Sequence, residues 1–289
     1  MSTPDAALRE YYEKNTRLFL HLGGGRSTYS LHRPVWGEGV STKSEAFSYP
    51  YRLVAHERAS VAREEGATRI LDLGCGVGGG LFYLADHSAA PVSATGITLS
   101  PTQVRLAREE ARSRGLSSQC TFRQGTFLDL PSLGPVDLAY AIEAFVLASD
   151  PRRFFAEAAA VLRPGGRLVI IDDVLAERPS QDTLDDRARH WVETFRAGWQ
   201  ADALRSGSTL RSLAREEGFV CRDDRDLTPG LHLHRLRDRL IAWGVVPLRP
   251  LLWRWAYFRG LIGGHALQQC LATGLIQYRC LVFERGASA

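Results

Sequence analysis

Residues 69–80 read Arg-Ile-Leu-Asp-Leu-Gly-Cys-Gly-Val-Gly-Gly-Gly. The apolar run predicts a short buried strand that ends in an acid, Asp72, and leads through a glycine turn into a helix starting near Leu81. Glycines at such a turn leave backbone N–H groups pointing outward and let a ligand approach the main chain closely. The stretch therefore predicts a site for a nucleotide-like cofactor. The turn alone does not say which cofactor, because dinucleotide sites carry a similar fingerprint.

The composition is that of an ordinary globular protein. The 289 residues are 45% apolar and 24% charged, which suits one enlarged α/β domain or a domain with a small cap. The net charge of +4 is mild and gives no sign of nucleic-acid binding. The five cysteines are scattered without a C-x-x-C pair, which argues against a disulfide framework or a zinc site and fits a reducing compartment. With no signal peptide and no apolar run of about 20 residues, we expect a cytoplasmic protein.

Strands and helices alternate between residues 69 and 174. Apolar runs predict strands at 69–73, 91–97, 120–124, 136–141 and 167–174, with helices between them. Near-continuous apolar strands that alternate with helices are typical of an α/β fold with a parallel sheet covered on both faces. We expect a helical N-terminal segment (1–66) with a helix over 44–65, an α/β core (67–180 and 206–229), two helical inserts (181–205 and 230–275) and a final core strand (276–289).

Five motifs, in this order, give the chain its resemblance to a known family. They are Asp-Leu-Gly-Cys-Gly-Val-Gly at 72–78, Gly-Ile-Thr-Leu-Ser-Pro-Thr-Gln at 96–103, Gln-Gly at 124–125 with Leu-Pro at 130–131, Val-Asp-Leu-Ala-Tyr-Ala-Ile-Glu at 136–143 and Val-Leu-Arg-Pro-Gly-Gly-Arg-Leu at 161–168. The chain resembles class I S-adenosylmethionine-dependent methyltransferases, and more narrowly the cyclopropane-fatty-acid-synthase, sterol and prenyl C-methyltransferase type. The resemblance implies a Rossmann-like sheet of seven strands with the last one antiparallel, helical inserts that form a lid, and S-adenosylmethionine as the cofactor.

The resemblance assigns cofactor contacts to the ends of the first two strands. The turn at Gly74 and Gly76 would approach the amino-acid tail and the ribose. The negative charge of Asp72 suits the ammonium or sulfonium, although this acid is equally suited to capping the turn. The acid that commonly ends the second strand and binds both ribose hydroxyls is absent. Thr98 and Gln103 would supply those hydrogen bonds instead, which weakens a dehydrogenase interpretation.

Further cofactor contacts are implied in the loop after the third strand and in the N-terminal segment. Thr126 would accept a hydrogen bond from the adenine amino group, and Phe127 would either stack on the ring or lie in the core. In the resembling families, tyrosines of the N-terminal segment close over the cofactor's carboxylate. For Tyr12 the alternative is that its side chain packs on the sheet. The expected cofactor contacts are Tyr12, Tyr29, Ser30, Asp72, Gly74, Gly76, Thr98, Leu99, Gln103, Gly125, Thr126, Phe127 and Ile142.

Glu143 is the best candidate for a catalytic base. It lies at the carboxyl end of the fourth strand, where open parallel sheets bind their ligands, and at the position where a prenyl diphosphate C-methyltransferase carries a proton-removing acid. The alternative is a surface acid at a helix start, which the helix dipole favours. Asp173 and His190 are the other expected catalytic residues; of Asp172 and Asp173 only one should face the cleft, because strand neighbours point to opposite sides. Val146 occupies the position of a bicarbonate-holding acid in cyclopropane synthases, which disfavours ring closure.

The two inserts are rich in aromatic side chains and are expected to bind the substrate. For 230–265 we expect a lid over a lipophilic molecule; peripheral contact with an anionic membrane, a homodimer interface and a basic solvated face are the alternatives. The sequence predicts an S-adenosylmethionine-dependent methyltransferase that acts on a lipophilic small molecule, by C-methylation of an isoprenoid-containing specialised metabolite. O- or N-methylation of a natural product, or non-catalytic binding of S-adenosylmethionine or a lipid, stays open. No metal and no nucleic-acid partner is expected.

Overall fold

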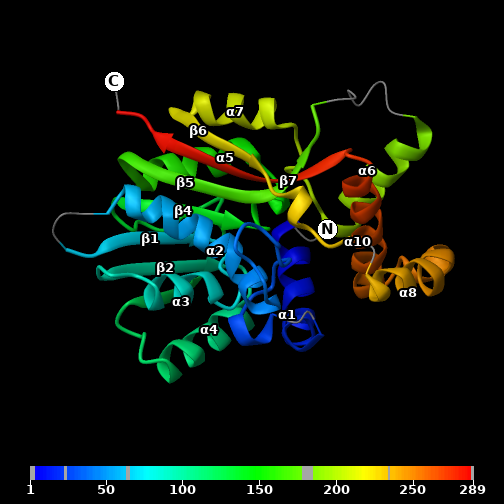
Figure 1. Ribbon diagram of the computed structural model, residues 1–289, viewed down its shortest axis with the longest axis horizontal. Coiled ribbons are helices and arrows are strands. Elements are labelled where there is room, and N and C mark those ends of the chain that lie inside the picture. The colour runs from blue at the N-terminus through cyan, green and yellow to red at the C-terminus, as the bar shows by residue number, and fades with distance from the viewer. Residues whose placement is uncertain (1–3, 23–24, 63–65, 178–184, 234, 288–289) are drawn as a thin grey trace.

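A seven-stranded sheet forms the centre of the computed structural model, which describes residues 4–22, 25–62, 66–177, 185–233 and 235–287 (Figure 1). The strands are β1 Thr68–Leu73, β2 Val92–Thr98, β3 Cys120–Gln124, β4 Val136–Ile142, β5 Leu162–Leu175, β6 Phe219–Asp226 and β7 Ile276–Arg285. Their order in the sheet is β3-β2-β1-β4-β5-β7-β6. β1 to β5 are parallel, and β7 runs antiparallel to both of its neighbours. The expected Rossmann-like methyltransferase sheet is confirmed.

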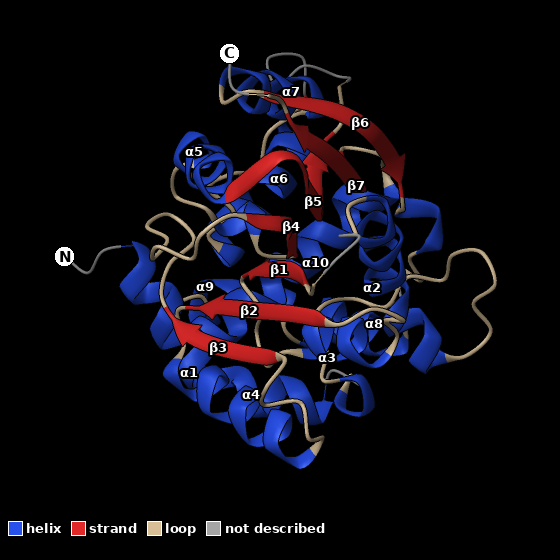
Figure 2. Ribbon diagram, turned by 90° about the vertical axis from the view of Figure 1, so that its left-hand side faces the viewer, coloured by secondary structure: helices blue, strands red, loops and turns tan. Residues whose placement is uncertain are grey.

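Helices cover both faces of this sheet (Figure 2). They are α2 Lys43–Ser60, α3 Gly79–Asp86, α4 Pro101–Ser113, α5 Pro151–Val161 and α7 Gly207–Glu216. On one face α2, α3 and α4 contribute to a core that includes Phe82, and on the other α5 and α7 contribute to a core that includes Phe155. Neighbouring strand residues divide between the two cores, as Ile70 and Leu71 of β1 do. This division explains why the strands are apolar throughout.

Two element boundaries differ by several residues from those expected from the sequence. β5 begins at Leu162 instead of 167 because β4 pairs with it in two registers. Val136 lies opposite Leu162 and Leu138 lies opposite Arg167, so the intervening Pro-Gly-Gly bulges out of the ladder. The helix expected over 44–65 is observed as α2, whose last residue is Ser60.

Helices from three separate segments form a cap at the carboxyl ends of the parallel strands (Figure 1). They are α1 Pro4–Leu22, α6 Asp186–Trp199 and α10 Ala256–Ala272, with α8 Leu236–Gly244 and α9 Arg249–Leu252 preceding α10. α6 and α10 approach closely, since a Cβ at Gly198 would lie 2.6 Å from the Cα of Gly263. The indole Nε1 of Trp199 donates to the Gly260 carbonyl at 2.9 Å, and Tyr11 of α1 covers the same glycine. No helix in the described part of the chain has the length and apolarity needed to cross a membrane.

Candidate active site

The glycine turn after β1 borders a cavity of about 50 Å³. Gly74 has a φ of +100° and Gly76 a φ of +52°, conformations that residues with side chains rarely adopt. A side chain at Gly74 would also collide with Ala144, because its Cβ would lie 2.4 Å from the Ala144 Cβ. Five expected cofactor residues line the cavity: Tyr29, Asp72, Gly74, Gly76 and Ile142. The fold therefore brings together the N-terminal loop, the glycine turn and the end of β4.

Three polar side chains that the sequence analysis did not assign also line the cavity: His32, Tyr51 and Tyr140. The carboxyl group of Asp72 lies among them and is 4% exposed. Burial raises the pKa of Asp72 to about 7, and the neighbouring Tyr140 moderates this shift. A cationic group in the cavity, such as an ammonium, would stabilise the ionised form of this carboxyl group.

His32 presents an unpaired ring nitrogen. Its Nδ1 lies 2.9 Å from the Arg33 carbonyl oxygen, and because a carbonyl can only accept, Nδ1 carries the proton. The other nitrogen, Nε2, is buried and meets no hydrogen-bond partner in the described ranges of the chain. Burial lowers the pKa of His32 against the opposing effect of the Glu143 carboxylate, so the ring is neutral at pH 7. The cavity residue His32 thus offers a hydrogen-bond acceptor.

Beside the cavity, Glu143 forms the centre of a buried polar cluster. Its Oε1 accepts three hydrogen bonds, from the backbone N–H and the Nε of Arg33, both at 2.9 Å, and from the Tyr278 hydroxyl at 3.0 Å. The Nη2 of Arg33 donates to Asp173 Oδ2 at 2.9 Å, and its guanidinium carbon lies 4.4 Å from the centroid of the Tyr278 ring. Glu143 has a φ of +49°, a strained conformation of a kind that clusters at functional sites.

The cluster contains the carboxyl groups of Glu143, Asp172 and Asp173 and a single guanidinium, that of Arg33. Because one positive charge serves three carboxyl groups, their pKa values shift in different directions. Burial opposes the ionisation of Glu143, but Arg33 outweighs it and holds the Glu143 pKa below its usual range. Burial raises the pKa of Asp173 to about 6, although Arg33 acts in the opposite direction. Burial and the neighbouring Asp173 raise the pKa of Asp172 well above its usual value. Glu143 is therefore the most readily ionised of the three.

The two aspartates near the end of β5 face opposite sides, as the sequence predicted. Asp173 reaches Arg33, whereas Asp172 accepts hydrogen bonds from the backbone N–H groups of Val146 at 2.9 Å and Asp173 at 2.8 Å. These bonds anchor the turn that follows β4. Asp173 also stands opposite Tyr278 in the antiparallel register of β5 and β7. The pairing of these two strands thus supplies two members of the cluster.

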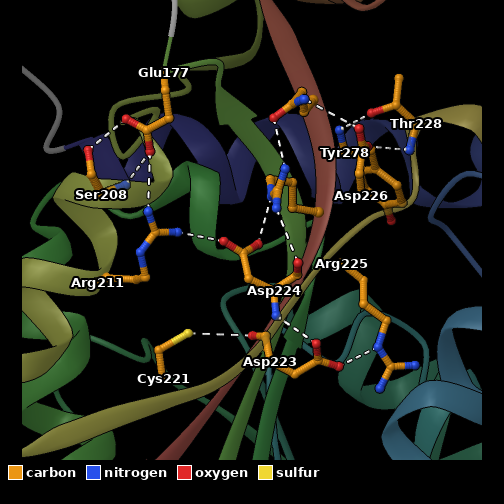
Figure 3. A network of polar contacts seen from close by, with 12 residues as sticks. Glu177, Ser208, Arg211, Cys221, Asp223, Asp224, Arg225, Asp226, Thr228 and Tyr278 are labelled. Atoms are coloured by element: carbon orange, nitrogen blue, oxygen red, sulfur yellow. Dashed lines mark hydrogen bonds and ion pairs between the residues drawn. The ribbon is translucent and has the colours of Figure 1, made fainter.

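Polar contacts along the outer strands hold Tyr278 in place (Figure 3). The backbone N–H of Tyr278 donates to Thr228 Oγ1 at 2.9 Å, and the Thr228 N–H donates to Asp226 Oδ1 at 2.8 Å. Further along β6, Asp224 accepts a hydrogen bond at 2.5 Å from Arg211 of α7. These contacts tie β6 to β7 and α7, and so support the strand from which the tyrosine hydroxyl reaches the cluster.

Thr98 and Gln103 form part of a latch between α1 and α4. The Gln103 amide accepts from Thr98 Oγ1 at 2.5 Å and donates through Nε2 to Thr16 Oγ1 at 3.1 Å. Glu13 of α1 accepts from the N–H of Thr102 at 3.0 Å and from its hydroxyl at 2.8 Å, at a helix N-terminus that favours an anion. Both ends of the Gln103 amide contact protein, and the expected role of Thr98 and Gln103 toward the cofactor stays a prediction.

Replacing Glu13 with alanine is expected to release α1 from α4. Losing these charge-assisted hydrogen bonds should cost about 1–2 kcal/mol locally, which corresponds to roughly tenfold more frequent opening of α1. Limited proteolysis should therefore cleave within α1 roughly tenfold faster than in the wild type. Lys14→Ala is the control, because it removes only an exposed contact with Glu10. Equal cleavage rates in the two variants would contradict the latch.

Two residues expected to close over the cofactor have partners next to the cavity. The hydroxyl of Ser30 lies 2.9 Å from that of Tyr51, which lines the cavity. Tyr12 of α1 lies near Glu143 and Asp172: burial raises its pKa, and both carboxyl groups add to the effect. Tyr12 thus lies beside the acidic cluster, which the sequence did not reveal.

Four further residues expected to contact the cofactor lie in the loops after β2 and β3. Leu99 is half-buried, and the N–H of Gly125 donates to the last carbonyl of β2 at 3.0 Å. The hydroxyl of Thr126 accepts a hydrogen bond from within its own loop. The Phe127 ring packs edge-on to Phe154, with centroids 5.4 Å apart, and also borders the glycine turn. Phe127 therefore contacts the core on one side and the glycine turn on the other.

His190 is exposed on α6, and its Nε2 lies 2.8 Å from Arg249 Nη1. The structure does not bring it into contact with Glu143 or Asp173. The residue that joins those two carboxylates is Arg33, which the sequence analysis missed. The one sequence feature that pointed to Arg33 was its place in the irregular polar loop that also contains Tyr29 and Ser30. A single arginine in a loop gives no indication of which distant acids it will meet.

Comparison with known proteins identifies the family of this chain. Residues 64–218 match the family described as a methyltransferase domain. The 24-methylenesterol C-methyltransferase 2 of Oryza sativa subsp. japonica is 34% identical over 66% of this chain and 54% of that protein. The O-methyltransferase cnsE of Penicillium expansum is 33% identical over 78% of this chain and 76% of that protein. The chain spans about half the length of the 24-methylenesterol C-methyltransferases that it matches.

A solved structure shows the same fold. The geranyl diphosphate C-methyltransferase from Streptomyces coelicolor A3(2), in complex with Mg²⁺, geranyl diphosphate and S-adenosyl-L-homocysteine, has a TM-score of 0.70. It is 18% identical in sequence, and the match covers 98% of both chains. The cofactor of this class of domain is S-adenosylmethionine. With the family match over more than half of its length and the relative from Penicillium expansum, the chain belongs to the methyltransferase domain family.

Proposed function

We propose that this chain transfers the methyl group of S-adenosylmethionine to a carbon atom of a lipophilic small molecule with an isoprenoid part. The observation that carries the proposal is Glu143, a buried and ionised carboxylate beside the cavity of the glycine turn. The relatives support the substrate class, because one is named for a sterol and the fold neighbour for geranyl diphosphate, both isoprenoids.

The chemistry of the residues that line the cavity suits the amino-acid tail of S-adenosylmethionine. Gly74 and Gly76 bring the main chain to the cavity wall, and the buried Asp72 is suited to an ammonium group. The unpaired Nε2 of His32 offers a further polar contact at this cavity, which Tyr29 also lines. When bound, S-adenosylmethionine supplies a methyl group on a sulfonium, which a nucleophile removes by in-line displacement.

Glu143 has the properties of a base for a carbocation. Methylation of an alkene carbon leaves a positive charge on the neighbouring carbon, from which a proton must then be removed. Even a weakly basic carboxylate can remove that proton, and its negative charge stabilises the cation beforehand. Three donors on Oε1 fix the orientation of the Glu143 carboxylate, and none of the described residues donates to Oε2, which leaves this oxygen for the substrate.

O-methylation is the second candidate function, and it would use a different base. The lowered pKa of Glu143 makes it a poor base for an alcohol or phenol, since an efficient base titrates near the working pH. His32 meets that requirement better, because its ring is neutral and its Nε2 is unpaired. The relative from Penicillium expansum is named as an O-methyltransferase, which supports O-methylation as the second candidate function.

S-adenosylhomocysteine carries the same ammonium group as S-adenosylmethionine, and its binding should depend on the titration of Asp72. Its pKa of about 7 means that the carboxyl group is protonated at lower pH and must ionise to pair with the ligand. The affinity should therefore rise about tenfold from pH 6 to pH 8 and then level off. Isothermal titration calorimetry measures this, with Asp72→Asn as the variant that should bind weakly and without pH dependence. Absence of binding at every pH would refute the cofactor assignment.

We also infer a reducing, cytoplasmic location. All five cysteines are free thiols, and four of them are buried. Unpaired cysteines of this kind are typical of compartments in which thiols stay reduced. Fractionation of cells that produce the protein, followed by thiol labelling of the denatured chain, would test the inference: five reactive thiols in the cytoplasmic fraction support it, and oxidised thiols or secretion contradict it.

A further inference from the structure

The segment 236–255 exposes an unusual amount of apolar surface. Eight large apolar side chains are exposed in the described part of the chain, and six of them belong to this segment. Trp243 is 83% exposed and Leu236 is 74% exposed, so other residues cover little of either side chain. We call these side chains the α8–α9 patch: Leu236, Leu240, Trp243, Leu248, Leu251 and Trp255.

The three large apolar residues of α8 that are exposed share one helix face. Leu236, Leu240 and Trp243 are spaced by four and three residues, which places them on a single stripe. Arg239 is exposed one residue before Leu240 and borders that stripe. α8 projects at the outer end of the cap, where it extends beyond α10 (Figure 1). The sequence analysis expected a lid over 230–265; α10 does pack into the cap, whereas the apolar stripe of α8 points to solvent.

Arginines accompany the patch along its whole length. Arg249 lies over the ring of Trp253 at 4.9 Å, and Arg254 lies over the ring of Trp255 at 4.1 Å. The segment 230–265 contains six arginines and a single acid, Asp238, a net charge of +5. The whole chain carries +4, so all residues outside this segment together carry −1. The positive charge of the protein is therefore concentrated where its apolar side chains are exposed.

We propose that the α8–α9 patch binds the surface of a bilayer that contains anionic lipids. Tryptophan and leucine side chains insert at the level of the headgroups, and arginines pair with lipid phosphates, when an amphipathic basic helix lies in the interface. This inference goes beyond the proposed reaction and does not depend on it. It also places the membrane next to α10, which packs against α1 and α6.

A second copy of the chain is a poorer occupant of this patch. Two-fold dimers bring the same surface of both subunits together, so two segments of charge +5 would face each other. The segment 230–265 offers one acid, Asp238, and its carboxylate already accepts a hydrogen bond from the backbone N–H of Arg235. An anionic lipid surface provides the complementary charge that a second copy lacks.

Vesicle co-sedimentation of the full chain tests the proposal. The probes are vesicles of phosphatidylcholine alone and with about one-third phosphatidylglycerol. The wild type should bind the anionic vesicles at least tenfold more tightly than the neutral ones, and about 1 M salt should remove most of this difference. Trp243→Ser should weaken binding about tenfold through the lost apolar contact. The double variant Arg235→Glu with Arg239→Glu should weaken it by about 25-fold or more, roughly fivefold for each charge removed.

A matched control separates the patch from overall charge. Arg112→Glu with Arg215→Glu changes the net charge equally, and both arginines are exposed on α4 and α7. This control should stay within about threefold of the wild type. Circular dichroism and thermal melting confirm that the variants are folded. The proposal is overturned if the wild type does not bind anionic vesicles or if the control loses as much as the patch variants. It is also overturned if light scattering shows a dimer that Trp243→Ser dissociates while vesicle binding is absent.

Discussion

Replacement of Glu143 by glutamine is expected to lower the rate of methyl transfer by about a thousandfold, within the range found for general bases. Glutamine keeps the shape of the side chain but removes both the charge that stabilises the carbocation and the site that takes its proton. Glu143 is adjacent to the cavity and is not among the residues that line it. The affinity for S-adenosylhomocysteine should therefore stay within about twofold of the wild type, as calorimetry can measure.

His32→Gln is the matched comparison for this variant. If the protein methylates an alkene, His32→Gln should retain most of its turnover, because the cation gives its proton to Glu143. If the acceptor is a hydroxyl, the two results should exchange: His32→Gln would lose activity and Glu143→Gln would keep it. Single-turnover kinetics with both variants decides between the two bases, since the unpaired Nε2 of His32 is buried in a residue that lines the cavity.

Replacement of Arg33 by methionine is expected to destabilise the protein by about 3–5 kcal/mol at neutral pH, the usual cost of breaking a buried ion pair. Arg33 donates to both Glu143 and Asp173, whose side chains are 11% and 1% exposed. Without it, Glu143 and Asp173 would be buried close together with no counter-charge for their ionised forms. Denaturant unfolding followed by fluorescence or circular dichroism measures the change in the free energy of unfolding.

The destabilisation should depend on pH in a defined direction. The Asp173 pKa, about 6 in the folded protein, lies above its unfolded value and would rise further without Arg33. The folded state then binds the proton more tightly than the unfolded state, so the variant should lose stability as the pH rises above about 4. Near pH 4 the difference from the wild type should be small. Adding Asp173→Asn should restore part of the lost stability, and a loss that is equal at all pH values would contradict this account.

The parts of the fold that could be predicted from the sequence are those set by local chemistry. The buried strand and the glycine turn of 69–80 appear as β1 and the start of α3, because positive φ angles at Gly74 and Gly76 require glycine. α4 begins after Ser100, whose hydroxyl accepts the Gln103 N–H at 3.1 Å, followed by a proline that suits the first turn. Each of these features involves residues that are close in sequence.

The arrangement of the acidic cluster could not be predicted in the same way. Arg33 meets acids that lie 110 and 140 positions further along the chain. Tyr278 joins them only because β7 pairs antiparallel with β5 in the register that places it opposite Asp173. Glu143 and Asp173 could be singled out individually, since Glu143 follows one apolar strand and Asp173 lies near the end of another, whereas their common partner depends on a loop conformation that has no periodic pattern.

The position of the transferred methyl group in the product tests the central claim most directly. The protein would be incubated with S-adenosylmethionine that carries an isotope-labelled methyl group and with a panel of isoprenoid alkenes and their hydroxylated analogues. Nuclear magnetic resonance of the product then shows whether the label is bonded to carbon or to oxygen. The account predicts a new carbon–methyl bond next to a former double bond, and its loss in Glu143→Gln. A labelled methyl ether formed at an undiminished rate by Glu143→Gln would contradict it.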